Sequence, residues 1–103
     1  MIKDLFKDAL PVLENVAPIV AKFIGGYPAI AAEYLLPLLT HAAGINTGDV
    51  GQLVKDIINK ESTQDMMKKF ECDHKDLLCN LLDNVNKLSS AEINVKLNFN
   101  KPD

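Results

Sequence analysis

The chain has 103 residues and a formal net charge of −3, a size that supports one small domain with a modest core. Hydrophobic residues make up 48% and charged residues 24% of the chain, a balance that argues against a disordered polypeptide. Its 11 basic side chains, all lysines, are outnumbered by 14 acidic ones. Because the chain lacks arginine, the usual bidentate reader of phosphates and bases, we expect no nucleic-acid binding.

The first 23 residues have apolar side chains at three- and four-residue spacing, which predicts a helix. Pro11 and Pro18 interrupt it, since each lacks an amide donor and collides with the carbonyl group four residues earlier. We expect either a kink or two short helices, with a break near Leu10 or near Ala17.

Two apolar arms meet at the next feature, Gly25-Gly26-Tyr27-Pro28. Glycine tolerates unusual backbone angles and proline favours the first turn of a new helix. We therefore expect an αα-hairpin whose structural turn is made by Gly25, Gly26 and Pro28, with a positive backbone dihedral at one glycine. The second arm, residues 28–43, should bend at Pro37 and end in a left-handed cap at the glycine that follows it.

Two amphipathic helices follow. A short one is expected over residues 48–60, capped by Asn46 or Thr47, and a long one over residues 63–88, capped by Ser62 or Thr63. The long helix contains a heptad pattern with steps of 3, 4, 3, 4, 3 and 4 residues. Its members are Met67, Phe70, His74, Leu77, Leu81, Asn84 and Leu88.

This heptad pattern has two interpretations. It can pack on the helix's own core, or it can join subunits of a homo-oligomer, in which case His74 and Asn84 set the register. The second interpretation makes Phe70, Leu77, Leu81 and Leu88 partner contacts.

The C-terminal segment changes period. Ile93, Val95, Leu97 and Phe99 alternate with polar residues, which predicts a β-strand with one wet face. An isolated strand leaves its backbone groups unpaired, so we expect it to pair in trans or to remain extended. The predicted architecture is mainly α, with a helical domain over residues 1–90 and a strand or tail over residues 91–103.

Candidate chemistry is sparse. Cys72 and Cys79 lie seven apart on one predicted helix, too far to form a disulfide, so both should be free thiols. With His74 and Asp76 they lack the paired spacing of zinc sites. Glu71 belongs to a run of alternating charges that a solvated helix face explains. We expect no enzyme activity, no catalytic or metal site and no cofactor.

Membrane insertion is disfavoured. Charged residues interrupt the start of the chain, so no secretory signal is expected. The most apolar stretch, residues 23–45, contains Glu33, His41 and the Gly-Gly-Tyr-Pro break, although it approaches the length of a membrane span.

Ala17-Pro18-Ile19-Val20-Ala21, followed by residues 24–31 (IGGYPAIA), resembles a segment of small bacteriophage proteins that are holin-like or uncharacterised. In those proteins an "AP-apolar-A" helix runs into a "GGP" turn and an alanine-rich helix; here Tyr27 stands between the glycines and the proline. The similarity covers about residues 8–60. It implies a phage origin and a location in the virion or the host cytoplasm, and it carries over no functional residue.

Together these features favour a phage protein that works by protein–protein association, as a virion structural or assembly component. An inhibitor of a host enzyme or defence complex is the first alternative. A membrane-active, holin-related protein is the second.

Overall fold

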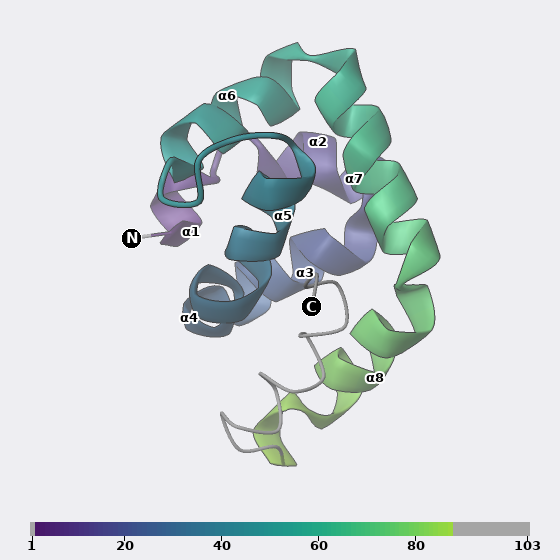
Figure 1. Cartoon of the computed structure of the whole chain (residues 1–103). Helices are drawn as coiled ribbons and strands as arrows, with labels where there is room; N and C mark the ends of the chain where they lie inside the picture. Colours follow the sequence, from purple (N-terminus) through teal and green to yellow (C-terminus); the bar gives the residue numbers. More distant parts are fainter. Residues whose placement is uncertain (1, 88–103) are drawn as a thin grey trace.

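The computed structural model describes residues 2–87, and this part of the chain is mainly helical, as predicted (Figure 1). The elements are α1 (Ile2–Leu5), α2 (Leu10–Val16), α3 (Pro18–Gly26), α4 (Pro28–Ile30), a π-helical turn (Ala31–Leu35), α5 (Leu36–Ala42), α6 (Val50–Asn59), α7 (Glu61–Asp73), α8 (Lys75–Asn84) and a 3-10 turn (Val85–Lys87). The predicted strand over residues 93–99 and the tail over residues 91–103 lie outside the described residues.

Both N-terminal prolines begin a helix. Pro11 lies in the first turn of α2, and Pro18 is the first residue of α3, where the missing amide of proline costs no intrahelical bond. Between the two helices Ala17 leaves helical geometry, with φ −150° and ψ 71°. The predicted breaks near Leu10 and Ala17 are therefore both present.

The expected glycine turn is wrong. Gly25 and Gly26 form the last turn of α3, and neither has a positive φ. The chain instead turns at Tyr27, which has φ −136° and ψ 62° and directly precedes Pro28, the first residue of α4. The arms Pro18–Gly26 and Pro28–Ala42 are bent by 108° and form a corner rather than an antiparallel hairpin. Proline explains this placement, because it pushes the residue before it out of the helical region.

Pro37 is accommodated without a break between α4 and α5. The helix widens into a π-helical turn just before it, in which the Leu36 amide donates to the Ala31 carbonyl. The wider turn moves the Glu33 carbonyl away from the proline ring, which has no amide to offer it. The predicted bend therefore takes the form of a local change of helical pitch.

Gly44 ends α5 as predicted, with φ 73°. Its amide donates to the His41 carbonyl at 3.1 Å and the Ile45 amide to the Thr40 carbonyl at 2.9 Å, the pair of bonds that defines a Schellman cap. The exposed side chain of His41 lies in the last turn of α5, where positive charge is favoured by the helix dipole.

The caps of the next two helices differ from expectation. Asp49, not Asn46 or Thr47, caps α6, because its Oδ1 accepts the Gln52 amide at 3.1 Å. Helix α7 begins at Glu61, before Ser62 and Thr63, and has no side-chain cap. The turn between the two helices is held by the Gln64 side-chain amide, which donates to the Ile57 carbonyl at 2.8 Å.

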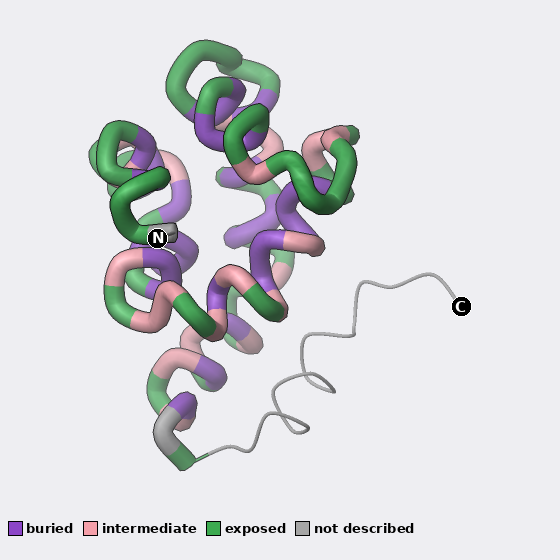
Figure 2. The backbone as a smooth tube through the Cα atoms, turned by 90° about the vertical axis from the view of Figure 1, so that its left-hand side faces the viewer, coloured by how far each residue is buried: buried purple, intermediate pink, exposed green. Residues whose placement is uncertain are grey.

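The helices surround one apolar core that runs from Phe6 to Val85 (Figure 2). Helix α7 packs against α2 and α6, and α8 turns beneath it to pack against α3 (Figure 1). The largest fully buried apolar side chains come from most of the elements: Phe6, Leu13, Val20, Ile24, Leu35, Leu36, Leu39, Leu53, Ile57, Met67, Leu78 and Leu81.

The glycine geometry gives a direct prediction. Gly25→Ala and Gly26→Ala should each raise the free energy of unfolding by about 0.5–1 kcal/mol, because both positions are helical. A new Cβ there meets no atom within 4 Å apart from its chain neighbours and the backbone of its own helix. Gly44→Ala should lower it by about 1–2 kcal/mol, because alanine disfavours a positive φ. Urea unfolding measures all three; destabilisation by both alanines in α3 would place the turn back at the glycines.

Candidate functional site: the elbow between α7 and α8

The long fourth helix predicted over residues 63–88 is broken at His74. This residue has φ −122° and ψ 20°, outside helical geometry, and separates α7 from α8. No glycine or proline lies between residues 61 and 87, so local sequence does not force the break. The cause must lie in what the two helices pack against.

The break follows the shape of the N-terminal helices. Pro18 sets an elbow between α2 and α3, and α7 packs on α2 while α8 packs on α3. One straight helix could not follow both partners around this corner. The second elbow is therefore imposed by tertiary packing onto the first.

Glu71 joins the two elbows. Its side chain belongs to α7 but is only 8% exposed, and its Oε1 accepts the backbone amides of Ile19 at 2.7 Å and Val20 at 2.9 Å. These are amides of the first turn of α3, which have no intrahelical partner. Ala17, the residue before the helix, has no side-chain acceptor to offer them.

The carboxylate thus supplies, from 52 residues along the chain, the cap that α3 lacks. Its negative charge also interacts favourably with the positive end of the helix dipole. The expectation that Glu71 lies on a solvated face is therefore wrong. Two sequence features are consistent with this role, although neither identifies the partner: α3 begins at Pro18 after Ala17, which cannot cap it, and Glu71 lies four residues after Met67 on the apolar side of α7.

The residues predicted to contact a partner differ in their burial. Phe70 and Leu81 are buried in the chain's own core, Leu77 is half-buried, and Leu88 lies outside the described residues, as do Ile93, Val95, Leu97 and Phe99. Beyond the elbow the buried positions are Leu78 and Leu81 of α8 and Val85 of the 3-10 turn that follows it. Of the heptad members predicted there, Leu81 is buried, whereas Leu77 and Asn84 are only half-buried. The heptad pattern in residues 67–85 therefore serves the monomer core to a large extent.

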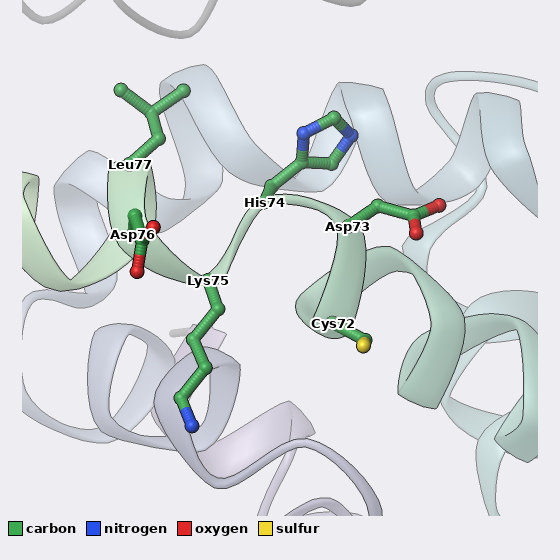
Figure 3. A pocket seen from close by; sticks show the side chains of 6 residues that line it. All are labelled: Cys72, Asp73, His74, Lys75, Asp76 and Leu77. Atoms are coloured by element: carbon green, nitrogen blue, oxygen red, sulfur yellow. The ribbon is translucent and has the colours of Figure 1, made fainter.

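The outer side of the elbow carries a hollow of about 400 Å³, lined by residues 72–77 (Figure 3). Its side chains diverge: His74 and Leu77 point to one side of the backbone and Lys75 to the other. A second hollow of about 300 Å³ lies between the end of α5 and α7. His74 lines both hollows, and its ring meets the Phe70 ring edge-on, with centroids 5.0 Å apart.

Charged and thiol groups near the elbow are accessible. The Lys69 ammonium donates to the Asp73 carboxylate at 2.9 Å, and this hydrogen bond raises the pKa of Lys69. Cys72 is exposed, Cys79 is half-buried and both are free thiols. Among residues 2–87, no group of three His, Cys, Asp or Glu side chains is placed to hold a metal ion.

A second buried carboxylate, Asp56 of α6, is only 7% exposed. The Gln52 side-chain amide donates to it at 2.7 Å, and the Lys60 ammonium lies 3.7 Å away. Like Glu71, Asp56 is held by partners within the fold.

No family model, curated protein or solved structure matches the chain. Within the described part, no single helix is long and apolar enough to cross a membrane. Helices Pro18–Gly26 and Pro28–Ala42 meet that criterion only when taken together across their 108° bend.

Removing the Glu71 carboxylate should be costly. Glu71→Ala leaves two buried amides without an acceptor and should lower the free energy of unfolding by about 2–4 kcal/mol. Glu71→Gln keeps an acceptor oxygen but loses the charge, so its cost should be smaller. Urea unfolding monitored by circular dichroism gives both values.

The matched control is Glu61, an exposed glutamate at the start of the same helix. Glu61→Ala should change stability by no more than about 0.5–1 kcal/mol. Equal effects at Glu61 and Glu71 would contradict a specific role for the buried carboxylate.

Proposed function

We propose that the protein is a non-enzymatic association module that binds a partner through residues 91–103. The observation that carries this proposal is that the buried core of the described residues runs from Phe6 to Val85, while the chain continues into a segment of strict period two. A strand added to another chain's sheet edge pairs its backbone groups and offers one apolar face to the partner. The side chains on that face are Ile93, Val95, Leu97 and Phe99.

The resemblance of residues 8–60 to small bacteriophage proteins supports a role in the virion or its assembly. The small size and net charge of −3 fit an inhibitor of a host enzyme or defence complex as well. Both roles require a protein partner, and they differ in whether the protein remains in purified virions.

The test separates folding from association. Deleting residues 91–103 should leave far-ultraviolet circular dichroism and the unfolding midpoint nearly unchanged but abolish capture of the partner, or of other copies, in a pull-down from expressing cells. Val95→Pro should act like the deletion, since proline removes a ladder donor. Val95→Ile, which keeps strand propensity, is the matched control.

Two outcomes would contradict the proposal. One is a truncated protein that unfolds outright, because residues 91–103 would then belong to the monomer's core. The other is a truncated protein that binds its partner with unchanged affinity.

A membrane-active role is the second candidate, favoured by the bent pair Pro18–Gly26 and Pro28–Ala42. Much of this apolar surface is used inside the fold, since Ile19, Val20, Phe23 and Ile24 of α3 are all buried. Insertion would require these side chains to leave the core.

Vesicle flotation distinguishes the two candidates. We expect the protein to stay in the aqueous fraction when mixed with phosphatidylethanolamine–phosphatidylglycerol vesicles, because its net charge is negative and its apolar side chains are largely buried. Flotation with the vesicles that survives a high-salt wash would favour the membrane-active role instead.

A further inference from the structure

We propose that His74 is a hinge at which α7 and α8 join into one continuous helix, and that α8 of the opened chain then packs on α3 of a second copy. This surface is separate from residues 91–103, so the inference goes beyond the proposed function. Its partner is the same chain, and its product is a two-fold dimer in which each copy donates α8 to the other.

The break itself is minimal. Only His74 leaves helical geometry, and the ladder bonds missing across it are those that the amides of Lys75, Asp76 and Leu77 would make in a continuous helix. The His74 amide is shared between the carbonyls of Phe70 at 3.2 Å and Glu71 at 3.3 Å, and the Leu78 amide donates to the His74 carbonyl at 2.9 Å. Rotation about one residue therefore converts two helices into one.

The apolar face continues through the hinge. Buried or half-buried side chains recur with steps of 4, 3, 4, 3 and 4 residues, the spacing of one stripe on a continuous helix. They are Met67, Glu71, His74, Leu78, Leu81 and Val85. Straightening the hinge keeps this stripe on one side of the helix, so α8 presents the same side chains after it swings out.

The contacts that α8 would exchange are well defined. Helix α8 packs on α3, whereas α7 packs on α2 and α6. Glu71 lies three residues before the hinge and remains bound to α3 of its own chain. The hinge therefore divides the chain into a body that stays intact and a helix that can leave it.

Exchange re-forms in trans the contacts that α8 makes in cis. The monomer and dimer then differ mainly at the two hinges, where the dimer gains helical residues, and in the entropy lost on association. Hinge composition and protein concentration should thus govern the balance between them.

A pair of variants at one position tests the hinge. His74→Ala and His74→Gly both remove the imidazole, so any contact it makes is lost equally in each. Alanine favours the continuous helix and glycine favours the break. Summed over the two hinges of a dimer, the difference in helix propensity corresponds to about 30-fold in the dimer dissociation constant. Sedimentation equilibrium from micromolar to millimolar concentration should show stronger dimerisation of His74→Ala than of His74→Gly.

A dimer formed by exchange of α8 is distinguished from other dimers by the distance between α3 of one chain and α8 of the other. In a chain with Cys72 and Cys79 replaced by serine, spin labels are attached at Lys22→Cys on α3 and Asn80→Cys on α8, both exposed positions. The distance between the two labels is first measured within a doubly labelled monomer. The same distance should then be found between chains, in dimers that combine one chain labelled at Lys22→Cys with one labelled at Asn80→Cys. A different interchain distance, equal dimerisation of the two hinge variants, or monomers throughout would each overturn the proposal.

Discussion

The Glu71 carboxylate at the N-terminus of α3 is the interaction on which the arrangement of the helices depends. Pro18 ends the first helical segment and begins the second, but the new helix starts without a capping side chain of its own. Its first free amides, those of Ile19 and Val20, are buried away from water, where unpaired donors would cost several kcal/mol in total. The carboxylate satisfies both and fixes α7 at the elbow of α2 and α3.

This one contact explains the path of the C-terminal helices. Once α7 is held at the elbow, its apolar stripe continues toward α3 only if the chain bends, and the bend occurs three residues later at His74. Helix α8 can then cover α3, which contributes Ile19, Val20, Ala21, Phe23 and Ile24 to the core. The same geometry leaves a single-residue break in an otherwise regular helix, and that break is the basis of the proposed exchange between copies.

Features governed by local chemistry could be predicted from the sequence. Periodicity identified the helices, and Pro11 and Pro18 placed the N-terminal breaks. Gly44 was predicted to be a cap because glycine tolerates the positive φ of a left-handed cap, and the structure confirms that angle. Features governed by contacts distant in sequence could not. The break at His74 has no local signal, and Glu71 looked like part of a solvated charged face.

The misplaced turn has a different origin. From the sequence, the turn was assigned to Gly25-Gly26, but glycine permits a turn without requiring one. In the structure the turn lies at Tyr27, because Pro28 restricts the backbone of the residue before it. The candidate site was also only partly predictable. Phe70 and Leu81 were identified as contact residues from a pattern that core packing and subunit packing share, and the structure places both in the core.

Amide hydrogen exchange at Ile19 and Val20 tests the central role of Glu71 most directly. Amides in the first turn of a helix ordinarily lack intrahelical partners and exchange quickly. Here we expect both to exchange as slowly as amides in the middle of α3, and to lose this protection in Glu71→Ala under conditions where the rest of the fold persists. Rapid exchange of both amides in the wild-type protein would contradict the carboxylate cap.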